Sequence, residues 1–228
     1  MTLPVLILRP MDGARQTERR AQELGLQTVV DPLFSVEPMT WSGPAVQDFD
    51  ALLLTSANAV AYGGTQLESY HPLPVLAVGE ATAAAAVNAG FHIAQTGASG
   101  AQTLLDVQPA GRHRSILWLA GEQHGALDAG ERQLHIVPVY RSRAIALGKK
   151  ALACLRAETV VLLHSARAAR HLAAELDRLH IRRDRHHAVA FSAKVAEAAG
   201  QGWRSVHTAC RPDDDALLSL ATGLCQSE

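Results

Sequence analysis

Short apolar runs alternate with alanine-rich amphipathic stretches along the whole chain. Stretches such as GARQTERRAQELG (13–25) and SARAARHLAAELDRL (165–179) have the apolar spacing of helices that bury one face. The apolar runs predict strands at residues 4–8, 28–31, 50–54, 74–78, 91–94, 115–119, 135–139, 159–163, 187–191 and 205–208. Short strands separated by helices are typical of βαβ crossovers, so we expect an α/β fold with parallel sheets that are buried on both faces.

Four blocks of the chain recur in the same order, at similar offsets. Ser56 matches Ser165 at an offset of 109 residues, and DPLF (31–34) matches VPVY (137–140) at 106. Both VGEATAAAAVNAG (78–90) with FSAKVAEAAGQGW (191–203) and ASGAQTLL (98–105) with RPDDDALL (211–218) match at 113. The shared order favours duplication over chance likeness of two α/β stretches. We therefore expect two copies of one unit of roughly 110 residues.

In both copies an apolar strand runs into a small polar turn that opens a helix. The four turns are Thr55-Ser56-Ala57-Asn58, Gly79-Glu80-Ala81-Thr82, His164-Ser165-Ala166-Arg167 and Ser192-Ala193-Lys194. Each one taken singly is explained by helix capping. Ligands of open α/β sheets bind at the carboxyl ends of the strands, so the four turns together would form a cradle for carboxylates or phosphates.

Composition excludes several functional classes. The formal net charge is −1 and the pI about 6.8, so no field favours nucleic acid or an acidic membrane surface as a partner. No apolar run reaches the roughly 18 residues of a membrane helix. The start, MTLPVLILRPMDG, lacks the features of a signal peptide, and we expect a cytoplasmic protein. Three widely spaced cysteines indicate reduced thiols: Cys154, Cys210 and Cys225.

Motifs of nucleotide, metal and hydrolytic chemistry do not occur in the sequence. It has no G-x-G-x-x-G, no phosphate loop, no nucleophile elbow and no H-E-x-x-H. His180, His186 and His187 lie among arginines without the spacing of metal ligands, so we interpret that segment as a solvated basic loop. The acidic run 213–215 is expected to form the first turn of the last helix.

Seven blocks in order along nearly the whole chain resemble the uroporphyrinogen-III synthase family. They are LILRP, LLLTSANAV, VLAVGEATA, VPVYRS, VVLLHSARAA, AVAFSAKVAEAA and RPDDDALLSL. The resemblance implies two flavodoxin-like α/β lobes with parallel sheets and a ligand cleft between them. One lobe would comprise residues 1–35 and 143–228, the other 42–136, and a two-stranded linker 36–41 and 137–142. The sequence alone also accommodates two tandem lobes divided near Pro109.

The resemblance also implies a reaction: cyclisation of the linear tetrapyrrole hydroxymethylbilane to uroporphyrinogen III, with loss of water and inversion of the last pyrrole ring. No cofactor or metal is required for it. The electron-rich pyrrole expels its hydroxyl readily, and unguided closure yields the symmetrical isomer, so the enzyme's task is positioning. The polycarboxylate substrate suits the cradle of turn hydroxyls and N–H groups, and the enzyme that makes hydroxymethylbilane is a candidate partner.

The resemblance carries over to single residues. Tyr140 matches a linker tyrosine and is the candidate to hydrogen-bond or protonate the departing hydroxyl; the alternative is that it packs the hinge. Two departures from the family pattern are Ala120-Gly121, where Arg-Gly is common, and Lys194, where a hydroxyl residue is common. Arg9, Arg141 and Arg143 are candidate partners of the substrate carboxylates. The alternative for each is a side chain that is solvated at the surface. The candidate substrate-binding residues are Thr55, Ser56, Thr82, Ser165, Ser192, Lys194, Arg9 and Arg141.

Two other functional classes remain open at this stage. A non-catalytic two-lobed protein that binds a small anion, of the periplasmic type, would have similar lobes, but the start of the chain does not resemble a signal peptide. A flavodoxin-like regulatory or flavin module is the other alternative, and it lacks the expected phosphate loop.

Overall fold

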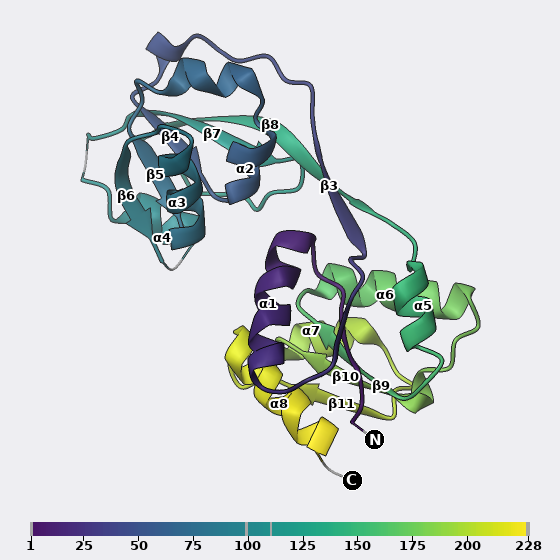
Figure 1. Ribbon diagram of the computed structural model, residues 1–228. Helices are drawn as coiled ribbons and strands as arrows, with labels where there is room; N and C mark the ends of the chain where they lie inside the picture. Colours follow the sequence, from purple (N-terminus) through teal and green to yellow (C-terminus); the bar gives the residue numbers. More distant parts are fainter. Residues whose placement is uncertain (1, 99, 110, 227–228) are drawn as a thin grey trace. The chain divides into compact units, whose positions relative to one another are not determined.

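The computed structural model describes residues 2–98, 100–109 and 111–226 (Figure 1). The chain divides into two compact units. Unit 1 comprises Met1–Ser35 and Ala144–Glu228, and unit 2 comprises Val36–Arg143. Each unit has its own sheet and its own hydrophobic core, so each is described by itself.

Unit 1 contains a sheet of five parallel strands in the order β11-β10-β9-β1-β2. Renumbered within the unit, this is the order 2-1-3-4-5 of flavodoxin-like sheets. The inner strand β9 is buried at all five positions, as a strand covered on both faces requires. The strands are β1 (Val5–Ile7), β2 (Thr28–Val30), β9 (Thr159–Leu163), β10 (His186–Ala190) and β11 (Ser205–Thr208).

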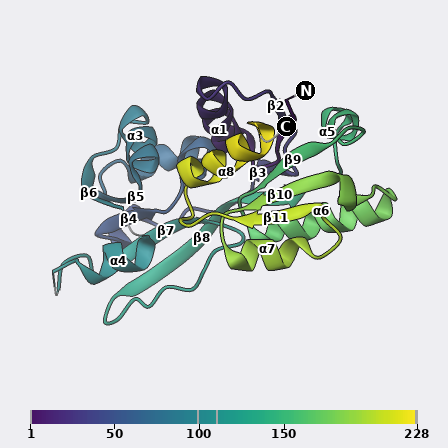
Figure 2. The ribbon, with the colours of Figure 1, turned by 90° about the horizontal axis from the view of Figure 1, so that it is seen from below.

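Helices cover both faces of the unit 1 sheet (Figures 1 and 2). On one face lie α1 (Met11–Glu23) and α8 (Asp214–Gln226), packed on Val5, Ile7 and Leu162. On the other face lie α5 (Lys149–Cys154), α6 (Ala166–Arg178) and α7 (Ala193–Ala199), packed on Leu6, Val161 and other alternate residues of the strands. A short 3-10 helix, η3 (Arg183–Arg185), precedes β10.

Unit 2 contains a six-stranded sheet in the order β3-β8-β7-β4-β5-β6. Helices α2 (Ala57–Tyr62) and α3 (Glu80–Asn88) pack on one face and α4 (Ala101–Asp106) on the other. Two short 3-10 helices complete the unit, η1 (Val46–Asp48) and η2 (Thr65–Tyr70). The strands are β3 (Phe34–Pro38), β4 (Ala51–Leu54), β5 (Val75–Val78), β6 (Ile93–Gly97), β7 (Ser115–Gly121) and β8 (Gln133–Ala144).

The long strand β8 has two neighbours in the sheet. Its first part pairs in parallel with β7, as far as Gly121 opposite Tyr140. Its pairing with β3 is antiparallel, because the Ile145 amide donates to the Leu33 carbonyl (2.9 Å) while the Met39 amide donates to the Val139 carbonyl (2.9 Å). The segments expected as a two-stranded linker, 36–41 and 137–142, overlap β3 and β8.

The two sheets repeat one strand order, since β6-β5-β4-β7-β8 corresponds to β11-β10-β9-β1-β2. Each of the ten expected strands is present, most of them with shifted ends, and the α/β fold with two mainly parallel sheets is confirmed. Along the chain, the central strand of this common order, β4, comes first in unit 2, whereas its counterpart β9 comes third in unit 1, after β1 and β2. The repeat found in the sequence is thus visible as a repeat of topology.

One expectation is wrong. The solvated basic loop ends before His186, which is 1% exposed and opens β10. His187 lies in the same strand, with Nδ1 2.7 Å from the Ser205 hydroxyl and Nε2 3.0 Å from a Glu158 carboxylate oxygen. Both histidine side chains are shielded from solvent because β10 is an inner strand, between β9 and β11.

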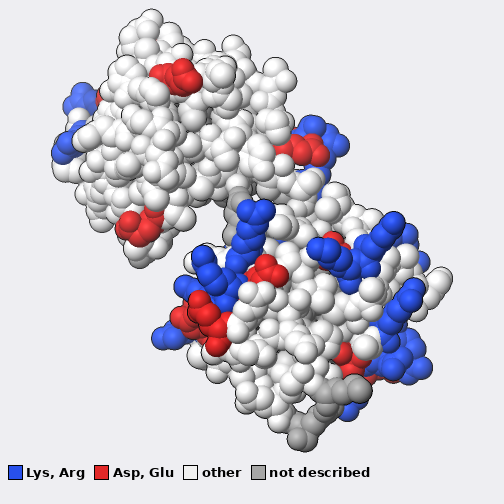
Figure 3. Space-filling model, viewed as in Figure 1, with Lys and Arg blue, Asp and Glu red and all other residues white. Residues whose placement is uncertain are grey.

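Within residues 2–98, 100–109 and 111–226, no cluster of three or more His, Cys, Asp and Glu has the arrangement of a metal site. The same residues include no helix that is long and apolar enough to span a membrane. Figure 3 shows Lys and Arg next to Asp and Glu on one face of unit 1, and a largely uncharged face on unit 2. That view has no single-sign stripe of the kind that binds nucleic acid.

Candidate functional site

The residues predicted from the sequence gather at the carboxyl edge of each sheet. In unit 1, Arg9 follows β1, His164 and Ser165 follow β9, and Ser192 follows β10. The carboxyl ends of parallel strands meet at one edge, so the three strands bring these residues to the same side of the unit. In unit 2 the corresponding residues are Thr55 and Ser56 after β4, Thr82 after β5, and Tyr140 in β8.

The ring of Tyr140 occupies the space that a side chain at position 121 would need, and residue 121 is a glycine. The two residues are partners in the β7–β8 ladder, beside a register shift. A β-carbon added at Gly121 would lie 2.9 Å from Cε2 and Cζ of the Tyr140 ring and 3.1 Å from its hydroxyl oxygen. The Ala120-Gly121 pair therefore has a structural role: Ala120 is fully buried, and Gly121 leaves room for the half-buried tyrosine ring.

The turn hydroxyls of unit 2 already make or border local contacts. Ser56 is the N-cap of α2, where its hydroxyl accepts the Asn58 amide at 3.2 Å. The indole of Trp118 donates to the Thr55 hydroxyl, also at 3.2 Å. Thr82 lies in the first turn of α3 and is 5% exposed. Capping explains Ser56 locally, and ligand contact by these hydroxyls remains a prediction.

The two linker arginines share one carboxylate. Arg141 Nε lies 3.3 Å from the Glu37 carboxylate and Arg143 Nε lies 3.2 Å from the same oxygen. Glu37 lies on β3 and both arginines on β8, so the three charges connect neighbouring strands. Arg141 is half-buried and Arg143 exposed. Surface pairs of this kind contribute at most about 1 kcal/mol.

The turn residues of unit 1 differ in what they do locally. The Ser165 hydroxyl accepts the Ala168 amide at 3.1 Å and caps α6. Ser192 occupies the N-cap position of α7, but its side chain makes no capping hydrogen bond. Lys194 lies in the first turn of α7 and is exposed. Of these three, Ser165 alone is committed to a local bond.

Arg9 belongs to a buried polar network. Its Nη1 donates to both carboxylate oxygens of Asp214 (3.0 and 3.2 Å) and to the Thr17 hydroxyl (3.2 Å). The Thr17 hydroxyl lies 2.7 Å from Asp214 Oδ2. Arg9 is 28% exposed and Asp214 7%. Arg9 is therefore not the solvated surface arginine of the alternative interpretation, because Asp214 and Thr17 hold its guanidinium.

His164 lies beside the same carboxylate. Its side chain is 7% exposed, its Nε2 lies 3.3 Å from Asp214 Oδ1, and its ring meets Phe191 edge-on at 4.6 Å between centroids. Burial lowers the pKa of His164, so the ring is neutral at neutral pH. Burial alone would raise the pKa of Asp214, but contacts with His164 and Thr17 and the charge of Arg9 lower it below its ordinary value.

Sequence reasoning missed Asp214, Thr17 and His164 as members of a common group. The run at 213–215 was expected to open the last helix, and α8 does begin at Asp214. The burial of this carboxylate depends on a partner 205 residues away, for which the sequence carries no local signal.

A model of the family named Uroporphyrinogen-III synthase HemD matches residues 15–219 of the chain. The chain belongs to this family. No curated protein sequence matches the chain significantly. The family match covers all of unit 2 and most of unit 1. The matched range includes Tyr140, Ser165 and Ser192 at the carboxyl edges of the sheets.

Solved structures of uroporphyrinogen-III synthases resemble the chain in fold. The uroporphyrinogen-III synthetase of Helicobacter pylori has a TM-score of 0.66 at 17% identity, over 98% of this chain and 100% of that one. A mutant uroporphyrinogen III synthase of Thermus thermophilus has a TM-score of 0.51 at 18% identity, over 99% and 100% of the two chains. At these identities the likeness is one of fold.

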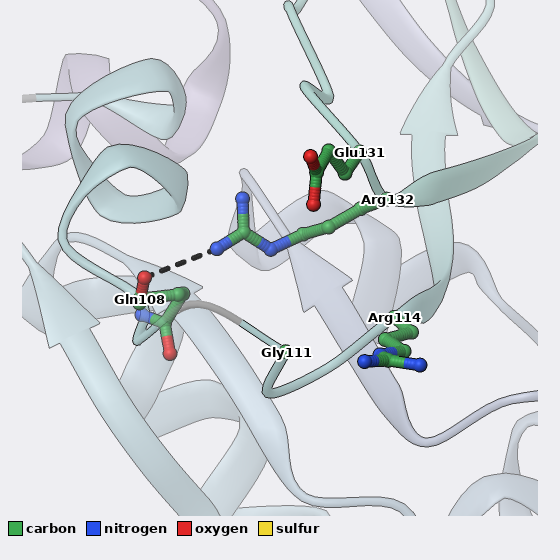
Figure 4. Close-up of a pocket in the computed structure, with 5 residues that line it drawn as sticks. All are labelled: Gln108, Gly111, Arg114, Glu131 and Arg132. Atoms are coloured by element: carbon green, nitrogen blue, oxygen red, sulfur yellow. Dashed lines mark hydrogen bonds between the residues drawn. The ribbon is translucent and has the colours of Figure 1, made fainter.

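In this uroporphyrinogen-III synthase family member, a further cavity lies at the opposite edge of the unit 2 sheet (Figure 4). It has a volume of about 440 Å³ and lies near the starts of β7 and β8. Arg132 extends along it and donates from Nη2 to the Gln108 carbonyl at 3.1 Å, which connects β8 to the segment after α4. Because Tyr140 lies at the other edge, we assign this cavity no part in the candidate site. Its lining residues are Gln108, Gly111, Arg114, Glu131 and Arg132.

Proposed function

We propose that this protein cyclises hydroxymethylbilane to uroporphyrinogen III, with loss of water and inversion of the last pyrrole ring. The observation that carries the proposal is the family match over residues 15–219. A chain that matches the family model over most of its length, and that has polar groups at the carboxyl edges of both sheets, is expected to keep the family's reaction. We also propose that no cofactor or metal takes part.

The residues at the two edges suit a reaction governed by positioning. The pyrrole expels its own hydroxyl, so the protein supplies modest help to the leaving group and firm control over which carbon attacks. Tyr140 is the proposed donor to the departing hydroxyl, and Gly121 sets where its ring lies. The turn hydroxyls and Arg9 are the proposed partners of the substrate carboxylates.

The test is a timed assay with freshly prepared hydroxymethylbilane, followed by oxidation and separation of the isomer I and isomer III porphyrins. We expect isomer III to increase in proportion to enzyme, without added metal or nucleotide and in the presence of a chelator. Heat-denatured protein is the control for spontaneous closure, which yields isomer I.

The proposal is wrong if isomer I is the only product at high enzyme concentration. Tight binding of the linear tetrapyrrole without isomer III would instead favour the non-catalytic alternative, a two-lobed protein that binds a small anion. Titration of the free ligand against the protein, followed by intrinsic fluorescence, separates the two cases.

A further inference from the structure

A small cavity opens at the carboxyl edge of the unit 1 sheet, where β1 and β9 end. Its volume is about 220 Å³. Three polar residues line it: Arg9, His164 and Ser165. The rest of the lining is apolar, from Leu8, Pro10, Leu162 and Ala168. Mostly apolar walls with a few convergent polar groups are typical of small-molecule sites.

Arg9 is held in one position beside this cavity. On one side Nη1 is bound by Asp214 and Thr17, as described above. On the other side the guanidinium lies over Gly13, where an added β-carbon would meet Nε and lie 2.7 Å from Cζ and 2.8 Å from Nη2. A guanidinium fixed before binding loses little conformational entropy when a ligand arrives.

Ser165 and the cavity walls add the remaining features of a site for a short chain with an anionic end. The Ser165 oxygen accepts the Ala168 amide, which leaves its O–H to donate to a ligand. Leu8 and Leu162 offer apolar surface to methylene groups. The charge of Asp214 opposes a second carboxylate nearby, so the affinity for a single arm is expected to be modest, with a dissociation constant on the order of millimolar.

We infer that this cavity binds one short alkyl carboxylate arm of the substrate, with the carboxylate on Arg9 and Ser165, and that Asp214 and Thr17 are positioning residues that hold Arg9. The identity of the arm as part of the substrate rests on the proposed function. The chemistry of the cavity itself does not, since any propionate-like group would meet the same donors.

The direct test is a titration of the isotope-labelled full-length protein with sodium propionate at constant ionic strength, followed by NMR. We expect saturable shifts of the amide signals of residues 165–168 and of the Arg9 side-chain N–H. Propionamide, which has the same shape without the charge, should bind at least about tenfold more weakly. The Arg9→Gln variant should lose the response, while Arg20→Gln should keep it, because Arg20 makes only an exposed pair with Asp215.

Variants at Thr17 distinguish a role in positioning Arg9 from a role in folding. Thr17→Val removes the hydroxyl that binds Arg9 and Asp214, so the propionate affinity should fall several-fold, and Thr17→Ser should restore it. In the cyclisation assay, Arg9→Gln should raise KM for hydroxymethylbilane about tenfold with little change in kcat, as expected when a binding contact equal in ground and transition states is lost. Melting temperatures establish that each variant is folded.

The outcomes of the two proposals are distinguishable. If the wild type makes no isomer III but propionate shifts the cavity signals, the proposed function fails and the carboxylate site stands. If isomer III forms but propionate leaves residues 165–168 unchanged, or if Arg9→Gln keeps the wild-type KM, the inference is overturned while the proposed function stands.

Discussion

The contact between Tyr140 and Gly121 predicts how sensitive turnover is to the position of one hydroxyl. Tyr140→Phe deletes the hydroxyl and leaves the ring in place. Proton donation to a leaving group is typically worth about 10²–10⁴-fold, and because the pyrrole drives the departure we expect the low end, about 10²-fold in kcat. That loss corresponds to about 2.7 kcal/mol in the activation free energy.

Gly121→Ala keeps the hydroxyl but moves it. The new methyl would lie 2.9 Å from two ring carbons, about 0.6 Å inside the roughly 3.5 Å at which carbon atoms make favourable contact. Because the ring is anchored in β8, it has to shift by several tenths of an ångström. Misplacement by about 1 Å can cost about 10²-fold, so we expect roughly a tenfold loss in kcat, smaller than that of Tyr140→Phe.

The assay is the rate of isomer III formation, with the ratio of isomer III to isomer I as a second readout. Two variants are matched controls in unit 2: Tyr62→Phe makes the same chemical change at the end of α2, and Gly125→Ala adds a methyl that meets no atom within 4 Å. Both should retain wild-type rates. A wild-type rate for Gly121→Ala or Tyr140→Phe, with an unchanged melting temperature, would refute the assignment and make the tyrosine structural.

Three further predictions concern stability and metal dependence. Ser165→Ala should lower the free energy of unfolding by about 1 kcal/mol because it removes the α6 cap, whereas Ser192→Ala, which removes no capping bond, should change it little; urea denaturation compares them. Hydrogen bonds from Arg178 (2.8 and 2.9 Å) and from the Leu147 amide hold the pKa of Glu175 at about 2, below its ordinary 4.5. The contribution of Glu175 to the free energy of unfolding is therefore fully present above about pH 4.5 and is lost as the pH falls towards 2. With solvent screening at the half-exposed Arg178, Glu175→Gln should cost about 1–2 kcal/mol at pH 7 and flatten the decline of stability between pH 4.5 and 2; equal acid limbs for variant and wild type would contradict this. Exhaustive chelation should leave the yield of isomer III unchanged, and a loss restored by one metal ion would show that the reaction depends on it.

The sequence by itself determined the elements and their repetition. Apolar runs of strand length between amphipathic helices are local patterns, and a parallel strand buried on both faces requires such a run, so β9 and β4 are readable without a structure. Helix capping is equally local, because the Ser56 and Ser165 hydroxyls bond amides two and three residues further on.

Only the tertiary structure decided which polar groups are buried and what they bind. Asp214 looks like an ordinary first-turn carboxylate until α8 packs over the end of β1, where it meets Arg9, 205 residues away. Gly121 likewise acquires its role from a ladder partner, Tyr140, that follows a long loop. Burial and pairing depend on which distant elements pack together, and hydrophobic periodicity reports only the face that each element buries, not the neighbour it meets there.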